Sequence, residues 1–270
     1  MKTFEEVKKE IGEIVGEASM CWTPYPTGVF DSERATTLCR RLEELAKHGY
    51  TGELADIVPM EEKKGYAYGD IDLIIWDLET TGFVAPECKI LEIGAFILRG
   101  DHMEHKHFVL DNKCEIPEKI TEITGITKAI IDAEGGDPKA AIEEFLELVT
   151  LARKNVTHNG IRFDIPFLVA YAGDLLGKDK KWENELATQL KEKAFDTAVH
   201  FKAKKVGAKQ GPSETFLSFA NRVMDMRVFG VKFNLGLCCE EQKVDTSKIS
   251  FHRAMGDVAM TYELYKAIAK

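Results

Sequence analysis

Residues 74–82 read IIWDLETTG, and this stretch decides which fold we expect. A run of apolar residues ends in two carboxylates, Asp77 and Glu79, that lie two positions apart. Side chains in a strand alternate between the two faces of a sheet, so both carboxylates share one face while Leu78 points to the other. Like charges held this close repel unless a cation lies between them, and Mg²⁺ or Mn²⁺ prefers such oxygen ligands. The stretch predicts a strand that supplies ligands to a divalent ion; a strand end whose polar residues meet solvent is the alternative.

The segments around this stretch follow the pattern of an α/β domain. Residues 71–80, 89–98 and 106–111 read as three adjacent strands, and the glycine-bearing turn RGDH joins the second to the third. From residue 137 onward, helical patterns alternate with short strand patterns such as NVTHNG and AFDTAVHF. An antiparallel triplet followed by alternating elements predicts a mixed sheet with helices on its faces.

The first 70 residues follow a different pattern. FEEVKKEIGEIV, residues 4–15, places apolar residues at spacings of three and four, as an amphipathic helix requires. The polar, glycine-bearing segment EEKKGYAYGD, residues 61–70, makes a plausible join to the strands that follow. We expect a small helical N-terminal extension over residues 1–70, of unknown role, and one larger domain over residues 71–270.

Composition excludes several classes of protein. No apolar run reaches the roughly 20 residues of a membrane-spanning helix, and the N-terminus lacks the apolar core of a secretory signal, so we expect a cytoplasmic protein without membrane contact. The six cysteines include no C-x-x-C pair, which argues against a zinc site or a disulfide framework. The formal charge of −9 is unusual for a protein that binds nucleic acid and needs an explanation.

Three more residues are candidates for the same chemistry. Asp164 precedes an apolar helical pattern in THNGIRFDIPFL, where the alternative role is a helix cap. Asp257 lies in a predicted amphipathic helix near the C-terminus, where it could equally face solvent. His252 precedes Asp257 by five residues, and its imidazole could accept a proton from water near neutral pH, although a loop histidine is the simpler reading.

Taken together, DLETTG, HNGIRFD and HRAMGD occur in this order and resemble the motifs of the DEDDh 3′→5′ exonucleases. That superfamily includes proofreading subunits of DNA polymerases and three-prime repair exonucleases, and the resemblance covers roughly residues 70 to 270. It implies a ribonuclease H-like mixed sheet flanked by helices. The related DEDDy enzymes place a tyrosine four residues before the last aspartate, where this chain has Arg253, so His252 is the expected base.

The resemblance also implies a site with two Mg²⁺ or Mn²⁺ ions. Asp77 would bridge both ions, Glu79 and Asp257 would complete the first, and Asp164 would hold the second. His252 would take a proton from the attacking water, and nucleoside 5′-monophosphates would leave one at a time from a 3′ end. An enzyme that grips only a few terminal nucleotides can bring much of its positive charge as metal ions, so the acidic composition is compatible with this function.

Further residues are expected to contact the substrate, with packing as the competing explanation for each. They are Thr80, Thr81, Gly82, Phe83, Ile126 and Asn159. The backbone amides of the first three would receive the terminal 3′-hydroxyl, and the apolar side chains would stack against or separate terminal bases. The lysines of FKAKKVGAKQG, residues 201–211, would contact the substrate backbone or form a solvated face.

The expected partner is a single-stranded 3′ end, DNA in preference to RNA. An RNA exonuclease of the ribonuclease T or oligoribonuclease kind is the alternative within the enzyme class, because the four acids and the histidine do not distinguish the sugars. A non-catalytic nucleic-acid or polymerase-docking module is the alternative of another class. A polymerase contact or a homodimer contact is compatible with either.

Overall fold

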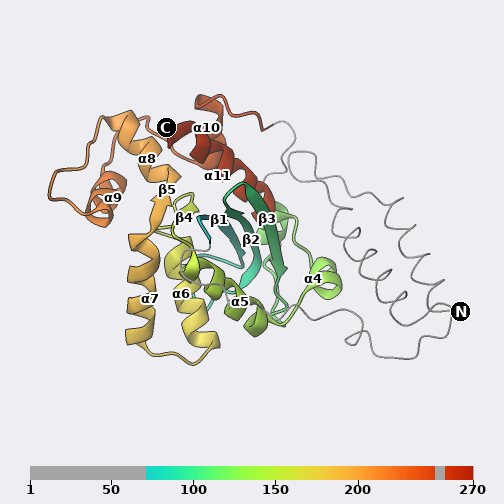
Figure 1. The fold of residues 1–270 in the computed structure, drawn as a ribbon. Coiled ribbons are helices and arrows are strands. Elements are labelled where there is room, and N and C mark those ends of the chain that lie inside the picture. The colour runs from blue at the N-terminus through green and yellow to red at the C-terminus, as the bar shows by residue number, and fades with distance from the viewer. Residues whose placement is uncertain (1–70, 247–252, 270) are drawn as a thin grey trace, which may run out of the picture. The chain divides into compact units, whose positions relative to one another are not determined.

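The computed structural model describes residues 71–246 and 253–269, which form one mixed sheet with helices on both faces (Figure 1). The strands are β1 (Leu73–Thr80), β2 (Ile90–Arg99), β3 (His102–Val109), β4 (Asn155–Thr157) and β5 (Ala194–Asp196). Their order is β3-β2-β1-β4-β5; β1–β2 and β2–β3 pair antiparallel, whereas β1–β4 and β4–β5 pair parallel. The predicted antiparallel triplet and mixed sheet are confirmed.

Helices occupy most of the remaining described chain. They are α3 (Glu118–Thr124), α4 (Lys128–Glu134), α5 (Pro138–Leu151), α6 (Asp164–Leu175), α7 (Lys180–Glu192), α8 (Thr197–Val206), α9 (Phe216–Asp225), α10 (Leu235–Glu241) and α11 (Ala254–Ile268). Capping side chains define several starts: Asp137 accepts from the Ala140 amide before α5, and Asp179 accepts from the Trp182 amide before α7. The segment AFDTAVHF contains both β5 and the start of α8, so it is a junction between a strand and a helix.

One face of the sheet is covered by α5 and α6. Trp76 and Leu78 of β1 belong to a buried cluster with residues of α5 and α6, and the rings of Trp76 and Phe145 meet edge to face at 5.4 Å. The Trp76 indole also donates to the Asn155 side chain over 3.1 Å, which satisfies a buried polar group between adjacent strands. The even-numbered residues of β1 therefore build the core, and the odd-numbered ones face the other way.

The opposite face is covered by α11, which packs across β1 and β2. Gly94 of β2 permits this approach, because a Cβ there would lie 2.7 Å from the backbone carbon of Ala254. Real Cβ atoms do not come this close to backbone, so only glycine fits. Asp77 and Glu79 thus point toward the helix that carries Asp257.

Two predictions lie outside the described residues: the helical extension over residues 1–70 and the position of His252. Within residues 71–246 and 253–269, each helix is too short or too polar to cross a bilayer.

Candidate active site

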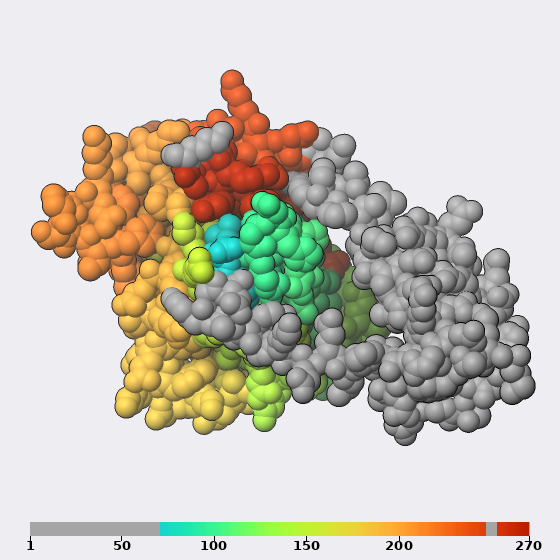
Figure 2. Space-filling view, in the orientation of Figure 1, coloured from blue at the N-terminus to red at the C-terminus, as the bar shows by residue number. Residues whose placement is uncertain are grey.

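Three carboxylates meet at the face of β1 that lies under α11. Asp77 and Glu79 project from β1, Asp257 lies in the first turn of α11, and one oxygen from each lies within 4.8 Å of the others. All three side chains are half-buried. In Figure 2, the cyan atoms of the β1 region lie between yellow-green atoms of the β4–α6 region and red atoms of the C-terminal helices. The structure therefore brings together three of the four acids that the sequence predicted.

The fourth acid, Asp164, lies beside this group. It is the first residue of α6, is only 3% exposed, and accepts a hydrogen bond from the backbone amide of Leu78, between the two acids of β1. Its charge also acts on Asp77 and Glu79. Asp164 does not cap α6, since the residue before that helix is Phe163 and makes no side-chain cap. Its carboxylate faces the other acids instead.

The turn before α6 is held by Asp196, which is 1% exposed at the end of β5. One Asp196 oxygen accepts from the Asn159 amide over 2.9 Å and the other accepts from the Ile161 amide over 3.1 Å. Asn159 adopts a left-handed conformation with φ of 65°, and at Gly160 a Cβ would lie 2.2 Å from the Thr157 hydroxyl. These constraints fix the path of the HNGIRFD motif, so they fix where α6 begins and where Asp164 stands.

The four carboxylates perturb one another electrostatically. Burial raises the pKa of Asp77 well above its ordinary value, and repulsion from the neighbouring acids adds to this shift. Burial and then repulsion from Asp257 raise the pKa of Glu79 to about 8. Burial likewise raises the pKa of Asp164 to about 7, although backbone hydrogen bonds partly offset it. The ionised forms of these acids are therefore disfavoured in the protein without a bound cation.

This donor set fits hard divalent cations. Among the residues that the structure describes, the clustered donors are carboxylate oxygens, which suit Mg²⁺ or Mn²⁺ better than metals that favour thiolate or imidazole ligands. A bound cation would favour the ionised form of each acid and so reverse the pKa shifts. The arrangement can thus hold divalent ions and the phosphate group of a substrate beside them.

A fifth buried carboxylate, Glu92 on β2, was not predicted to have a role. Glu92 pairs with Glu79 across the β1–β2 ladder and is 1% exposed, yet its surroundings differ from those of Glu79. Burial alone would raise the pKa of Glu92, but hydrogen bonds from His107, Arg253 and the Ala254 amide outweigh it and hold the pKa at about 2. A charged residue within the apolar strand ILEIGAFIL was the signal in the sequence.

The last residue of β1 and the residues after it form the start of a turn. Thr80 donates from its hydroxyl to the Gly82 carbonyl over 2.7 Å, and the Thr81 amide donates to the Lys89 carbonyl over 2.8 Å. The Thr81 amide is therefore already used by the backbone, which corrects the prediction that it receives a 3′-hydroxyl. Gly82 lies against Cys88, whose sulfur would be 2.6 Å from an added Cβ. Phe83 is 85% exposed and meets Phe163, the neighbour of Asp164, edge to face at 6.2 Å.

Ile126 and Asn159, two other predicted substrate contacts, differ in how deeply they are buried. Ile126 is 1% exposed in a small apolar cluster with Leu91, Val109 and Ile131, so its role is packing and we no longer propose it as a substrate contact. Asn159 is half-buried, and its backbone forms the turn before α6.

The lysines of residues 201–211 do not form a uniform basic face. Lys202 is 4% exposed, donates to the Met224 carbonyl over 2.9 Å and lies over the Phe233 ring. Lys205 pairs with Glu241 over 2.5 Å. The prediction that this cluster contacts the substrate is therefore wrong for Lys202, whose ammonium group is used inside the protein.

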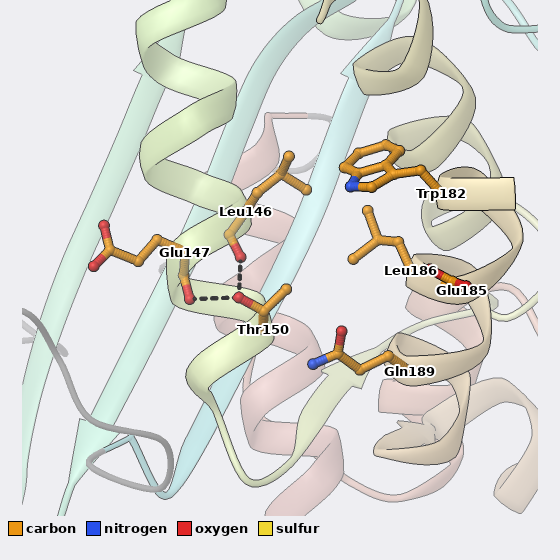
Figure 3. Close-up of a pocket in the computed structure, with 7 residues that line it drawn as sticks. All are labelled: Leu146, Glu147, Thr150, Trp182, Glu185, Leu186 and Gln189. Atoms are coloured by element: carbon orange, nitrogen blue, oxygen red, sulfur yellow. Dashed lines mark hydrogen bonds between the residues drawn. The ribbon is translucent and has the colours of Figure 1, made fainter. Parts of the chain in front are cut away.

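A groove elsewhere on the surface lies between α5 and α7 and is distinct from the acidic site (Figure 3). Its volume is about 300 Å³. Leu146, Glu147 and Thr150 line it from α5, and residues of α7 line it from the other side. The Thr150 hydroxyl is already used by backbone carbonyls of α5, and none of the four clustered acids lies in the groove. We therefore place the chemistry at the acid cluster.

A mixed sheet with acids gathered from β1, α6 and α11 defines the class of ribonuclease H-like exonucleases, and comparison with known proteins agrees. The profile of a family described as Exonuclease matches residues 74–265, so the chain belongs to that family, within the DEDDh 3′→5′ exonuclease superfamily. These residues form an exonuclease domain of the hydrolase class.

Curated relatives are polymerase components. The chain is 34% identical over 128 residues to a PolC-type DNA polymerase III of Clostridium perfringens, covering 45% of this chain and 8% of that protein. It is 26% identical over 221 residues to the Ureaplasma parvum PolC-type polymerase, covering 81% of this chain and 13% of the relative. It is 27% identical over 145 residues to the DNA polymerase III subunit epsilon of Aquifex aeolicus, covering 53% of this chain and 69% of the relative.

Solved structures agree on the fold. E. coli exonuclease I in complex with a dA16 oligonucleotide superposes with a TM-score of 0.53 at 17% identity, covering 73% of this chain and 41% of that chain. A structure of SSB/exonuclease I with an inhibitor gives a TM-score of 0.54 over the same shares of the two chains. The ribonuclease H-like fold expected from the sequence is thus confirmed.

Proposed function

We propose that this chain is a metal-dependent 3′→5′ exonuclease that releases nucleoside 5′-monophosphates from the 3′ end of DNA, with single-stranded or frayed ends preferred. The observation that carries the proposal is the convergence of Asp77, Glu79 and Asp257 within 4.8 Å, with Asp164 beside them. Membership of the exonuclease family supports the reaction class. The DNA polymerase relatives and the oligonucleotide bound to exonuclease I favour DNA as the substrate.

Each side chain has a role in this proposal. Asp77, central among the acids, would be shared between two Mg²⁺ or Mn²⁺ ions; Glu79 and Asp257 would complete one ion site and Asp164 the other. Bound ions would stabilise negative charge on the attacking and leaving oxygens of an in-line displacement at phosphorus. His252 would take the proton of the attacking water, and the shortened strand would keep the 3′-hydroxyl as its new end.

Phe83 would hold the terminal base. Its ring is exposed and lies against Phe163, next to Asp164, so a base that stacks on it would bring its phosphate toward the acids. The backbone of Thr80 and Gly82 and the side chain of Asn159 would position the terminal sugar. We also propose that residues 1–70 form a helical extension, that the protein makes a polymerase or homodimer contact, and that it acts in the cytoplasm.

The test compares three 5′-labelled substrates of one length: single-stranded DNA, duplex DNA with a mismatched 3′ end, and RNA. With Mg²⁺ or Mn²⁺ we expect a ladder that shortens from the 3′ end and releases mononucleotides, fastest on single-stranded DNA. A chelator should abolish it. Asp77→Asn should lower turnover by orders of magnitude, whereas Glu143→Gln, on the exposed side of α5, should match the wild type.

Other outcomes would replace the proposal. Faster degradation of RNA than DNA would identify the RNA exonuclease instead. Binding of single strands without any metal-dependent release of mononucleotides would identify the non-catalytic module. Wild-type turnover by Asp77→Asn would refute the assigned site.

A further inference from the structure

The first turn of α11 is attached to β2 by a two-contact ion pair that lies beside the acid cluster. The Arg253 guanidinium donates from Nη2 to Glu92 Oε1 over 2.6 Å and from Nε to Glu92 Oε2 over 3.1 Å. The Glu92 side chain is 1% exposed and that of Arg253 is 33% exposed. A fixed guanidinium fork on a buried carboxylate is a directional contact, so it defines an orientation as well as a distance.

The same carboxylate also caps the helix. Arg253 is the residue before α11 and makes no side-chain cap of its own. Instead, the Ala254 amide donates to Glu92 Oε2 over 3.1 Å, so the capping group comes from β2 and not from the helix's own N-cap residue. A negative charge at a helix N-terminus satisfies a free amide and interacts favourably with the helix dipole. Glu92 thus holds both the side chain and the backbone at the start of α11.

Close backbone packing supports the same attachment. Gly94 lies two residues after Glu92 on the same face of β2, and a Cβ there would lie 2.7 to 2.9 Å from the backbone of Ala254 and Met255. The helix therefore rests directly on the strand, with no side chain between them. Asp257 belongs to this first turn, and its amide donates to the Arg253 carbonyl over 3.0 Å.

Glu92 is not itself placed to bind a cation. Its Oε1 accepts from Arg253 and lies 2.5 Å from His107 Nε2, and its Oε2 accepts from Arg253 and the Ala254 amide. Both oxygens are therefore occupied by donors. This separates Glu92 from Glu79, its partner across the ladder, although the two are adjacent carboxylates.

We propose that Glu92 is a positioning residue: with Arg253 and the Ala254 amide, it locks the first turn of α11 onto β2 and so sets where Asp257 stands relative to Asp77 and Glu79. The consequence for turnover rests on the proposed function, whereas the consequence for cation binding does not. Groups that orient metal ligands through a second layer of contacts commonly change metal affinity or activity roughly ten- to hundredfold when they are replaced.

The experiment uses the full chain and three variants. Glu92→Gln removes the negative charge of the ion pair. Arg253→Lys keeps the positive charge but loses the two-contact geometry. Gly94→Ala pushes α11 away from β2 without changing any charge. Glu214→Gln is the matched control, because Glu214 accepts from Arg222 Nε and Nη2 over 2.8 and 2.7 Å, away from the acid cluster. Each protein is checked for folding by circular dichroism in a chelator.

The first readout is Mn²⁺ affinity without nucleic acid, measured by calorimetry. We expect roughly ten- to hundredfold weaker binding for Glu92→Gln and Gly94→Ala, a smaller loss for Arg253→Lys, and wild-type affinity for Glu214→Gln. The second readout is kcat and KM on single-stranded DNA at saturating Mn²⁺, where kcat should fall more than KM rises. A purely structural pair would lower stability and leave both readouts of the folded protein unchanged.

Failure of this proposal and failure of the proposed function give different results. Folded Glu92→Gln and Gly94→Ala proteins with wild-type Mn²⁺ affinity would overturn the positioning role. If Glu92→Gln does not fold, Arg253→Lys decides: wild-type affinity overturns the role and weaker affinity supports it. A wild-type protein that binds Mn²⁺ but degrades no nucleic acid would refute the exonuclease proposal, and the affinities would still decide the role of Glu92.

Discussion

Replacing Glu79 by glutamine should make the metal-free protein more stable. The ordinary pKa of a glutamate is 4.5, whereas burial and repulsion from Asp257 raise that of Glu79 to about 8. At pH 7 the folded protein therefore holds a proton on Glu79 that the unfolded chain has released. The pKa is raised in the folded state, so the stability that Glu79 contributes is fully present below pH 4.5 and is lost as the pH rises toward about 8.

The size of this loss of stability follows from the difference between pH 7 and the ordinary pKa of a glutamate. About 2.5 pH units at 1.36 kcal/mol per unit correspond to a cost of about 3 kcal/mol in the free energy of unfolding at pH 7. Glutamine keeps the shape of the side chain and does not titrate, so Glu79→Gln should recover much of this cost. At pH 5 the two proteins should differ by less than about 1 kcal/mol.

The assay is urea unfolding in a chelator at pH 5, 7 and 9, with Glu143→Gln as the control on an exposed helical glutamate. Repeating it with Mg²⁺ or Mn²⁺ should stabilise the wild type strongly and Glu79→Gln only weakly, because binding to the folded state alone adds to stability. A variant that is less stable than the wild type at pH 7, or a difference that does not grow with pH, would refute the reasoning.

Two further substitutions test the turn before α6 through protein stability and the exposed Phe83 ring through substrate binding. Asp196→Ala should lower the free energy of unfolding by about 3 kcal/mol or more in urea titrations, because it leaves buried amides such as those of Asn159 and Ile161 without an acceptor; an unchanged midpoint would contradict this. Phe83→Ala should raise KM on single-stranded DNA about tenfold, from the roughly 1–3 kcal/mol of one stacked base, and leave stability unchanged because the ring is exposed. Wild-type KM would remove Phe83 from the substrate path.

The first two strands could be predicted because residues 71–80 and 89–98 are runs rich in apolar and β-branched residues. The alternation at the end of β1 predicted Asp77 and Glu79 on one face and Leu78 on the other, and the structure has this arrangement. The helix α7 was not predicted, because only Leu186 and Leu190 of its thirteen residues are buried and its lysines resemble a surface loop. Its apolar residues do recur at helical spacing, so the helix was missed because of its low apolar content and not for lack of periodicity.

The acids of the site could be named from the sequence, whereas the residues that hold them in place could not. Asp77, Glu79, Asp164 and Asp257 were recognised from their motifs, and the structure brings Asp77, Glu79 and Asp257 within 4.8 Å of one another with Asp164 beside them. The role of Glu92 depends on Arg253, which is 161 positions away in the chain, and local spacing does not reveal such pairs. Asp196 lies in the segment AFDTAVHF, and the amides from which it accepts hydrogen bonds are defined only by the folded turn.

The position of α11 at the far end of the described chain has a consequence for folding. β1 carries the first two acids, whereas Asp257 arrives with a helix whose Val258, Met260 and Leu264 must also be buried. Contacts between such distant segments form late, because closing a long loop costs entropy before any contact repays it. Recovery of cation binding during refolding should therefore follow the recovery of strand signal and report the moment when this helix docks.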